Sequence, residues 1–373
     1  MKRAVLLTVL SAIACDICLG GIDTQVIEKG LESHDRALHI KDGWIRDPYI
    51  VLAPDGYYYL TGTTPLPQDE RQVSDRYNTG LGPQSIVGYK MQLWPSQDLM
   101  HWEYLGTPYS LLDGIWYQAQ PERFEQTEQA QWRLWAPELH PIDGRWVIVH
   151  TSPSPVPGAN LSVTDGAVLQ GPFANPLGVA IGRRHDPSLF VDDDGSIWII
   201  WGATQIAPLR PDLSGLAGEA TRIGPANRNM GHEGCLIRKI GGKYVLFGTG
   251  WSTDKMRRGT YNLYYCTSEK ITGPYGPRQF AGRFLGHGTP LQDQEGRWWC
   301  TAFFNADVPP LARAELATRD MSDNAYTING QGVTIVPLDV KVRPDGSIHI
   351  RAKDPDYARP GPEEAQSFEL TAD

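Results

Sequence analysis

The chain has 373 residues, of which 41% are hydrophobic and 21% are charged, and its formal net charge is −9. This length can bury a sizeable core in one large domain or two modest ones, and an acidic chain without a Lys/Arg cluster is a poor candidate for binding nucleic acid or an anionic membrane surface. Its 39 Gly, 29 Pro and 12 Trp indicate many short strands joined by tight turns rather than helices. Neutral polymers remain open as partners.

Residues 1–20 have the pattern of a secretory signal peptide. Two basic residues, Lys2 and Arg3, precede an apolar run over residues 4–13, and small residues follow. The apolar run is too short to cross a bilayer. The residues around Cys15 also resemble a weak lipoprotein signal, in which this cysteine would carry the lipid. We therefore predict a secreted or periplasmic protein without a transmembrane segment.

Five segments of the remaining chain share one pattern. Each has a short apolar strand, a turn made of an acidic residue and Gly or of two Gly, and then an aromatic-rich strand, with the turn eight positions after the first residue. The five first residues are Asp47, Trp135, Asp186, Glu233 and His287. Each segment predicts a β-hairpin, and the last three intervals, of 51, 47 and 54 residues, suit four-stranded propeller blades.

The predicted fold is all-β, with a single five-bladed β-propeller over residues 44–325. A lead-in over residues 21–43 precedes it, and a short closing segment over residues 326–373 follows, with one hairpin and, from residue 354 onward, a loose tail. A β-sandwich, or two unrelated β-domains, is the alternative.

The first interval of the repeat is longer than the others, at 88 residues. It predicts an insertion in the first blade, within residues 65–85 or 106–132.

The first strand of each propeller blade lies near the axis, so the five first residues are expected around one cavity. Three carboxylates, from Asp47, Asp186 and Glu233, would meet there. Buried carboxylates are costly unless they are paired or functional. Two carboxylates that flank a glycosidic bond are the minimum machinery of most glycosidases, because one protonates the leaving oxygen while the other activates water or attacks the anomeric carbon. A third carboxylate can raise the pKa of the acid.

The order and spacing of these segments, over roughly residues 44–305, resemble glycoside hydrolase family 43. The motifs that carry the resemblance are Arg46-Asp47-Pro48, Trp135-Ala136-Pro137-Glu138, His185-Asp186-Pro187, His232-Glu233-Gly234 and Gly286-His287-Gly288. The resemblance implies an inverting mechanism, with Asp47 as general base, Glu233 as general acid and Asp186 as the residue that tunes and orients the acid. One departure is Cys235, where the family often has Pro.

The resemblance also implies that His287 contacts a calcium ion or water on the propeller axis. Calcium prefers oxygen ligands, so a structural Ca²⁺ here would be held mainly by water. No cofactor is expected to be required.

Aromatic residues near the proposed rim are candidates for stacking on the apolar faces of sugars. They are Trp44, Trp116, Trp135, Trp201 and Trp251, and His287 is a further candidate for contacting substrate. Trp135 is the best candidate because its register points it inward, although packing between blades explains each tryptophan equally well. His185 and His232 directly precede two of the carboxylates, and alternation along a strand predicts that they point away from the site.

These observations together predict an exo-acting inverting hydrolase of plant-type oligosaccharides or polysaccharides, such as α-L-arabinofuranosides, β-xylosides or galactans. A retaining fructan hydrolase is an alternative, but it would be expected to have Glu-Cys and Asn-Asp-Pro where this chain has Glu233-Gly234 and Arg46-Asp47. A non-catalytic sugar-binding propeller is another, but such propellers tend to repeat one motif in every blade.

Three cysteines remain beyond the signal region: Cys235, Cys266 and Cys300. Their number is odd and they lack C-x-x-C spacing, so a zinc site is not expected. We expect partly buried thiols, with one disulfide possible in an oxidising compartment.

Overall fold

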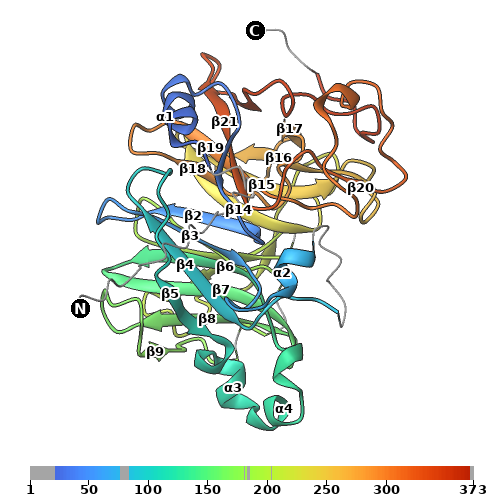
Figure 1. Ribbon diagram of the computed structural model, residues 1–373. Coiled ribbons are helices and arrows are strands. Elements are labelled where there is room, and N and C mark those ends of the chain that lie inside the picture. Colours follow the sequence, from blue (N-terminus) through green and yellow to red (C-terminus); the bar gives the residue numbers. More distant parts are fainter. Residues whose placement is uncertain (1–21, 76–83, 180, 183–184, 203, 370–373) are drawn as a thin grey trace, which may run out of the picture.

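The computed structural model describes residues 22–75, 84–179, 181–182, 185–202 and 204–369. The predicted signal peptide lies outside these residues. Among the described residues, no helix is both long and apolar enough to cross a membrane. Most regular structure is β, arranged in five sheets (Figure 1).

The five sheets are the blades of a five-bladed β-propeller, which confirms the predicted fold. Blade 1 contains β2 (Arg46–Leu52), β3 (Tyr58–Thr63), β4 (Lys90–Ser96) and β5 (Gly106–Ser110). Blade 2 contains β6 (Arg133–Ile142), β7 (Arg145–Ser154), β8 (Gly158–Thr164) and β9 (Phe173–Ala174). Blade 3 contains β10 (Ser188–Val191), β11 (Ile197–Trp201), β12 (Gln205–Leu209) and β13 (Thr221–Arg222).

Blades 4 and 5 each carry an additional strand. Blade 4 contains β14 (Glu233–Ile240), β15 (Lys243–Trp251), β16 (Gly259–Ser268) and β17 (Gln279–Gly282), and β20 (Ala325–Tyr326) pairs in parallel with β16. Blade 5 contains β18 (Pro290–Gln292), β19 (Trp298–Ala302), β21 (Val333–Val342) and β1 (Leu38–Lys41), and β22 (Ile348–Ala352) pairs with β21.

Blade 5 closes the ring with strands from both ends of the chain. β1 pairs antiparallel with β21, placing Leu38 opposite Ile335. The hydrogen-bonded sheet therefore extends beyond the predicted propeller range of residues 44–325 on both sides. A four-residue strand such as β1 has too little alternating pattern to be recognised without its partner.

Helices lie outside the blades. α1 (Thr24–Ser33) packs next to β1, and Asp23 caps its N-terminus by accepting from the backbone N–H of Gln25 at 3.0 Å. Blade 1 carries short helices in both ranges where an insertion was predicted. They are α2 (Arg71–Ser74), η1 (Leu111–Asp113), α3 (Ile115–Ala119), α4 (Pro121–Glu125) and η2 (Gln129–Gln131), with η3 (Arg313–Glu315) later in the chain. Figure 1 shows α3 and α4 projecting from the lower end of the molecule.

The segment after residue 354 packs against blade 4. The buried Glu363 carboxylate forms an ion pair with the buried Arg283 guanidinium at 2.8 Å. Glu364 accepts a hydrogen bond from the Tyr264 hydroxyl at 2.8 Å. The predicted loose tail is therefore wrong for this part of the segment. Glu363 is buried and Glu364 is partly buried, because each meets a partner about 80–100 positions away in the sequence.

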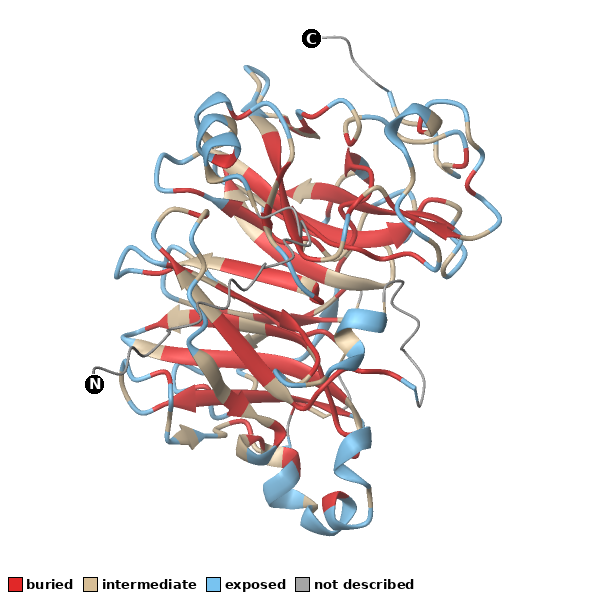
Figure 2. Cartoon of the chain, in the orientation of Figure 1, coloured by how far each residue is buried: buried red, intermediate tan, exposed pale blue. Residues whose placement is uncertain are grey.

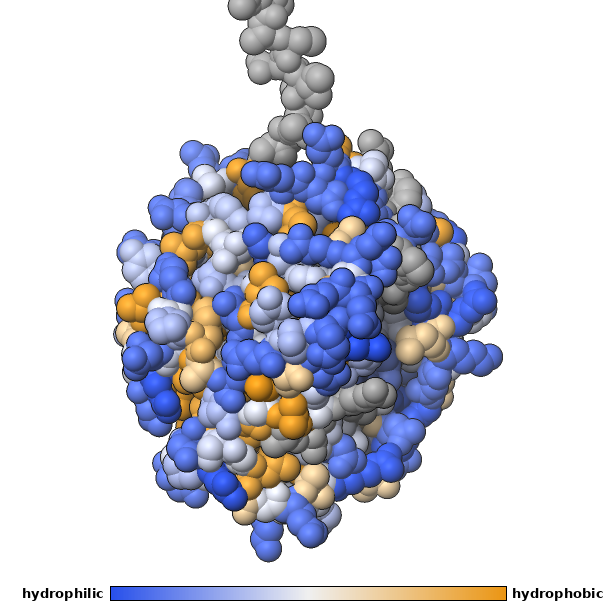
Figure 3. All heavy atoms as spheres, turned by 90° about the horizontal axis from the view of Figure 1, so that it is seen from below, coloured by the Kyte–Doolittle hydropathy of each residue, from blue (hydrophilic) through white to orange (hydrophobic). Residues whose placement is uncertain are grey.

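The core lies within and between the blades. Figure 2 shows buried residues following the strands, whereas most connecting loops, and α3 and α4 apart from Trp116 and Phe124, are mainly exposed. The surface seen from below carries small groups of apolar residues between hydrophilic ones (Figure 3), an ordinary arrangement for a protein surface. Cys235, Cys266 and Cys300 are buried free thiols, which is the simpler of the two states expected from the sequence.

Candidate active site

Every blade begins with a residue in the left-handed backbone conformation. The five φ angles are 48° at Asp47, 45° at Ala136, 43° at Asp186, 61° at Gly234 and 53° at His287. This conformation is uncommon for residues other than Gly, so its recurrence in all five blades marks a shared structural position. In β2, β6 and β14 the strand register shifts at this point.

Hairpin length explains why counting from the turns did not find the same position in every blade. Five residues separate the paired Leu52 and Tyr58 in blade 1, and blades 3 and 5 have loops of the same length. Only two residues separate Ile142 from Arg145 in blade 2, and blade 4 has the same short turn. The assumption of one common register was therefore wrong for blades 2 and 4.

In those two blades, counting eight positions back from the turn reaches the residue before the left-handed one. Trp135 and Glu233 are consequently equivalent to Arg46 in blade 1, whereas Ala136 and Gly234 are equivalent to Asp47.

Two adjacent positions of each inner strand can face the axis, because the left-handed residue interrupts strand alternation. A cavity of about 70 Å³ is lined by Arg46, Asp47, Thr63, Trp135, His185, Asp186, Glu233 and His287. The structure thus brings the three predicted carboxylates, His287 and Trp135 to one place.

Carboxylates and imidazoles alternate along this cavity. His287 Nδ1 lies 3.3 Å from Asp47 Oδ1 and 3.9 Å from Asp186 Oδ2. His185 Nε2 then lies 3.1 Å from Asp186 Oδ2 and 3.1 Å from Glu233 Oε2. The three carboxylates are therefore connected through two histidines, and protonation of either histidine offsets the negative charge on both sides of it.

His185 was expected to point away from the site, and that expectation was wrong. Simple alternation would place His185 and Asp186 on opposite faces of the strand. The left-handed conformation of Asp186 instead lets both side chains face the cavity. His232 likewise contacts Glu233, with Nε2 3.3 Å from Oε1.

Tyr261 is a site residue that sequence reasoning missed. Its hydroxyl donates a hydrogen bond to Glu233 Oε1 at 2.5 Å, and it lies 3.0 Å from Thr249 Oγ1. Tyr261 stands on β16, the third strand of blade 4. The repeat pattern located only the first two strands of each blade near the axis, so it gave no signal for this contact.

Threonine hydroxyls on the second strands fix the first strands of the site. Thr63 Oγ1 donates to Asp47 Oδ2 at 2.7 Å and accepts from the backbone N–H of Ala136 in the next blade at 2.7 Å. Thr151 Oγ1 accepts from the backbone N–H of Asp186 at 2.7 Å. The same type of hydrogen bond, from a backbone N–H to a threonine hydroxyl of the preceding blade, therefore links blade 1 to blade 2 and blade 2 to blade 3 at the cavity.

The surroundings shift the pKa values of Asp186 and Glu233 in opposite directions. Burial raises the pKa of Asp186 to about 6, although the charges of His287 and His185 oppose this rise. Burial also favours a higher pKa at Glu233, but hydrogen bonds from His185 and His232 outweigh it and hold that pKa well below its usual range. The resting site therefore favours an ionised Glu233.

The histidines between the carboxylates become stronger bases. Burial disfavours the imidazolium of His185, but the hydrogen bond to Glu233 and the charge of Asp186 prevail and raise its pKa to about 9. The pKa of His287 is raised in the same way, because the charges of Asp47 and Asp186 outweigh its burial. These shifts favour the protonated form of His185 near neutral pH and also favour the protonated form of His287.

Three predicted tryptophans lie at or next to the site. Trp135 lines the cavity and packs with the buried Trp44. Trp251 stacks on Tyr261, with ring centroids 4.7 Å apart and an interplanar angle of 26°. The indole N–H groups of all three are buried without a hydrogen-bond partner among the described residues.

The other two tryptophans have different surroundings. Trp116 is buried in a hydrophobic cluster of blades 1 and 2, and its indole N–H donates to the carbonyl of Ala159 at 2.8 Å. Trp201 is buried in a cluster formed by blades 2 and 3. The structure does not bring these two side chains to the axial cavity.

The predicted calcium ion would have to lie beside His287. A second, smaller cavity of about 10 Å³ borders His287 and is also lined by Asp47, Glu138 and Asp186. That space holds about one water molecule, whereas Ca²⁺ takes six to eight oxygen ligands. A calcium ion with a full shell of water would therefore also need space in the adjoining cavity, which His287 lines as well.

One further group of residues has the donor atoms for a metal ion. His185, Asp186 and Glu233 offer ligand atoms that lie within 4.8 Å of one another. The same atoms are engaged with each other through the hydrogen-bonded contacts of His185.

Comparison with known proteins gives a family for this arrangement. A family model described as glycosyl hydrolases family 43 matches residues 39–319. Among curated relatives, the extracellular endo-α-(1→5)-L-arabinanase of Thermotoga petrophila is 25% identical over 226 residues, covering 51% of this chain and 47% of the relative. The xylan 1,3-β-xylosidase of a Vibrio species is 24% identical over 322 residues, covering 78% of this chain and 53% of the relative. The chain thus spans about half the length of these relatives.

Solved structures share the fold. A family 43 protein from Bacillus licheniformis superposes with a TM-score of 0.57 at 19% identity, over 89% of this chain and 60% of that one. An exo-1,5-α-L-arabinanase from a bovine ruminal metagenomic library gives a TM-score of 0.53 at 18% identity, over 83% of this chain and 98% of that one. Since the family model covers about three quarters of the sequence, the chain belongs to family 43 of the glycosyl hydrolases.

Proposed function

We propose that this protein is an inverting glycoside hydrolase that removes terminal sugars from plant-type polysaccharides or oligosaccharides. The observation that carries the proposal is the group of three carboxylates, Asp47, Asp186 and Glu233, at one axial cavity with three different sets of neighbours. Carboxylates with separated acidities are the requirement for general acid–base cleavage of a glycosidic bond.

Asp47 is the general base in this proposal. Thr63 donates to one of its oxygens, Oδ2, and thereby orients the carboxylate. The other oxygen, Oδ1, faces His287 at 3.3 Å. A water molecule held by Asp47 would attack the anomeric carbon and lose its proton to this carboxylate as the new C–O bond forms.

Glu233 is the general acid, although its resting state is ionised. Protonated His185 is hydrogen-bonded to Glu233 Oε2, so it can pass its proton to that carboxylate when the glycosidic oxygen arrives. Glu233 then protonates the leaving oxygen as the glycosidic bond breaks. The His185 side chain is 40% exposed and can take up a replacement proton from solvent.

Asp186 holds the acid side of the site in place. It contacts His185 and faces His287, and it also raises the basicity of both imidazoles through its charge.

The proposed substrates are α-L-arabinofuranosides, β-xylosides and galactans. Two relatives are named as an arabinanase and a xylosidase, and these names support the first two classes. Trp135 provides an apolar surface at the cavity on which a sugar face can stack.

We propose further that the protein is exported. Lys2 and Arg3 followed by the apolar run support this, as does the relative that is named as extracellular. The mass of the mature protein and its cell fraction test the proposal: an intact N-terminus in the cytoplasm would contradict it.

The test of the hydrolase proposal is a substrate screen combined with product stereochemistry. The protein from residue 22 onward would be assayed on nitrophenyl α-L-arabinofuranoside, β-D-xyloside and β-D-galactoside, and on arabinan, arabinoxylan and galactan. The double variant Asp47→Asn/Glu233→Gln serves as the control for contaminating glycosidases. We expect release of one sugar by the wild type and none above background by the double variant.

Proton NMR of the first product then distinguishes the mechanisms. An initial product with the opposite anomeric configuration supports inversion, and the same configuration supports the retaining alternative. Sugar binding without turnover on any substrate at any pH would support the non-catalytic alternative and contradict the proposal.

A further inference from the structure

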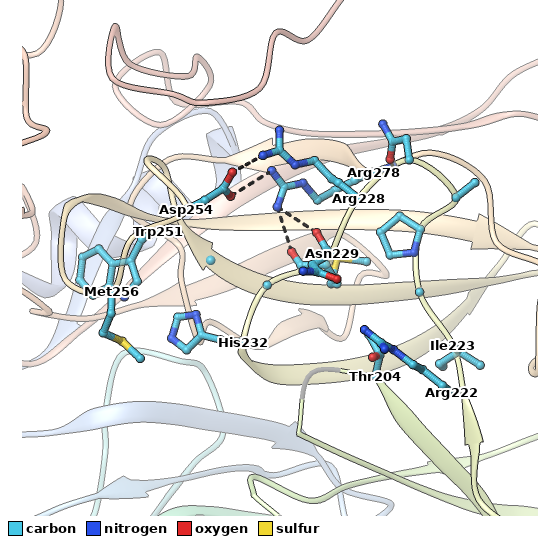
Figure 4. Close-up of a pocket in the computed structure, with 17 residues that line it drawn as sticks. Thr204, Arg222, Ile223, Arg228, Asn229, His232, Trp251, Asp254, Met256 and Arg278 are labelled. Atoms are coloured by element: carbon cyan, nitrogen blue, oxygen red, sulfur yellow. Dashed lines mark hydrogen bonds and ion pairs between the residues drawn. The ribbon is translucent and has the colours of Figure 1, made fainter.

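A large open cleft lies between blades 3 and 4, beside the axial cavity. Its volume is about 1040 Å³. Thr204 and Arg222 line its blade 3 side, and Trp251 and Met256 lie on its blade 4 side (Figure 4). Residues 223–232, which connect β13 to β14, also line the cleft. This cleft is much larger than the axial cavity and has no role in the mechanism so far.

The cleft is positively charged in an acidic protein. Its lining includes three arginines, Arg222, Arg228 and Arg278, but only one carboxylate, Asp254. The whole chain has 34 basic and 43 acidic residues, so the lining of the cleft is basic although the chain as a whole is acidic. A local reversal of charge inside a cleft concentrates anions there.

Two of the arginines share the one carboxylate that lines the cleft. Asp254 forms an ion pair with Arg228 and lies 3.8 Å from Arg278 Nη2 (Figure 4). Arg222 is exposed on β13, across the cleft from that pair. Among the lining residues, one carboxylate therefore stands against three guanidinium groups, and the Glu364 carboxylate outside the lining also acts on Arg278. The surplus of positive charge lies mainly at Arg222.

Arg278 is fixed as a built-in wall of the cleft. Its side chain is 2% exposed, its Nε donates to Gln366 Oε1 at 2.8 Å, and its Nη1 donates to the carbonyl of Asn229 at 3.1 Å. The guanidinium also lies 4.1 Å from the centre of the Tyr264 ring. Its Nη2 is buried without a hydrogen-bond partner among the described residues.

The cleft continues directly to the proposed acid. His232 lines the cleft and contacts Glu233, and Trp251 lines it while stacking on Tyr261, whose hydroxyl donates to Glu233. The general acid protonates the oxygen of the leaving group, so the part of the substrate beyond that oxygen lies on the Glu233 side. The leaving part of the substrate would therefore enter the cleft.

We propose that this cleft binds a sugar unit bearing a carboxylate, a uronic acid, in the leaving part of the substrate or in a branch next to it. Arginine presents a planar fork of donors that matches a carboxylate in two parallel hydrogen bonds. The inference rests on the proposed hydrolase function only for the orientation of the substrate, because binding of an acidic sugar can be measured without turnover.

The rest of the lining suits a single acidic sugar better than a long polyanion. Asn227 and Asn229 are exposed amides that can bond sugar hydroxyls, and Met256 is an exposed apolar side chain at the cleft, 68% accessible. The net charge of −9 would repel a densely charged polymer, whereas one carboxylate needs only the local surplus.

The test compares matched ligands. A xylo-oligosaccharide with one glucuronic acid, its methyl ester, and the analogue in which a sulfate ester replaces the acid would be titrated calorimetrically into Asp47→Asn protein at low salt. We expect the acid to bind at least tenfold more tightly than the ester and more tightly than the sulfate. We also expect this preference to shrink in 0.2 M NaCl.

Variants assign the preference to the cleft. Arg222→Gln, which changes an exposed side chain, should reduce the acid-to-ester preference at least threefold. The double variant Arg222→Gln/Arg228→Gln should reduce it at least tenfold. Arg210→Gln, an exposed arginine outside the cleft, is the matched control and should keep the wild-type preference.

The outcomes separate this inference from the proposed function. Equal affinity for acid and ester, or a preference that survives the double variant, would overturn the cleft assignment even if neutral aryl glycosides are hydrolysed. A preference lost in the double variant would support the cleft even if no substrate is cleaved. Tighter binding of the sulfate would overturn the assignment to a uronic acid.

Discussion

The odd-numbered and even-numbered blades contribute to the axial cavity in different ways. Blades 1 and 3 place a carboxylate, and blade 5 an imidazole, at the left-handed first position, from Asp47, Asp186 and His287. Blades 2 and 4 have Ala136 and Gly234 at that position. Their side chains toward the cavity come from the residue before, which is Trp135 in blade 2 and Glu233 in blade 4.

This difference separates the proposed base from the proposed acid. Asp47 belongs to the left-handed position and is oriented by Thr63 of its own blade. Glu233 belongs to the preceding position and is surrounded by donors from three different residues, His185, His232 and Tyr261. In the proposed mechanism, one end of the cavity positions water while the other supplies and replaces a proton.

The largest expected loss of activity follows from changing the proposed base, Asp47, in blade 1. Asp47→Asn should lower kcat/KM about 10²–10⁴-fold on every substrate, because activation of water does not depend on the leaving group. Steady-state kinetics on an aryl glycoside and on an oligosaccharide would check this. Asp194→Asn, at an exposed turn of blade 3, is the matched control, with an expected change under about twofold. A wild-type rate in Asp47→Asn would rule out this base.

When the proposed acid, Glu233 in blade 4, is changed, the loss of activity should depend on the leaving group of the substrate. Glu233→Gln should lower kcat/KM about 10²–10⁴-fold on an oligosaccharide, whose alkoxide needs a proton. On a dinitrophenyl glycoside the loss should be about tenfold or less, because that phenolate leaves without protonation. The two substrates measured side by side give the contrast. An equal loss on both would contradict the role of Glu233 as acid.

Sequence reasoning recovered the five hairpins and most residues of the cavity, because Asp-Gly and Gly-Gly turns are local signals that need no tertiary information. It misplaced blades 2 and 4 by one residue, because the turn lies eight positions after the left-handed residue in a five-residue hairpin but only seven positions after it in a two-residue hairpin. It also assumed strand alternation, which the left-handed Asp186 interrupts, and so turned His185 away from the site.

Contacts between distant segments left no comparable signal. Tyr261 reaches Glu233 from the third strand of blade 4, and β1 is recognisable only beside β21. Glu363 lies in a segment whose charged and Pro-rich composition suggests an exposed tail, and only the folded structure shows that it pairs with Arg283. Each of these depends on the closed ring rather than on a local pattern.

A matched pair of backbone variants tests the left-handed position itself. Gly234→Ala should lower the free energy of unfolding by about 1–2 kcal/mol, because φ is 61° at this position and a Cβ would lie 3.0 Å from His287 Cδ2. Ala136→Gly should change the free energy of unfolding by less than about 0.5 kcal/mol. Glycine removes the strain of the left-handed φ of 45°, and this gain offsets the larger conformational entropy that glycine gives the unfolded chain. Thermal unfolding would show the difference, and equal melting temperatures for the two variants would refute the equivalence.

The smallest effect concerns the imidazole that joins the two ends. The folded-state pKa of His185 is raised to about 9 from 6.5, so its stabilisation is complete below pH 6.5 and is lost as pH rises toward 9. The full shift would correspond to about 3 kcal/mol, but the side chain is 40% exposed, so we expect about 1 kcal/mol. Melting temperatures between pH 6 and 9.5 should therefore fall about 1–2 °C more in the wild type than in His185→Gln. His101→Gln, on an exposed residue of blade 1, should keep the wild-type slope, and a parallel slope in His185→Gln would show that the proton does not reside on this histidine.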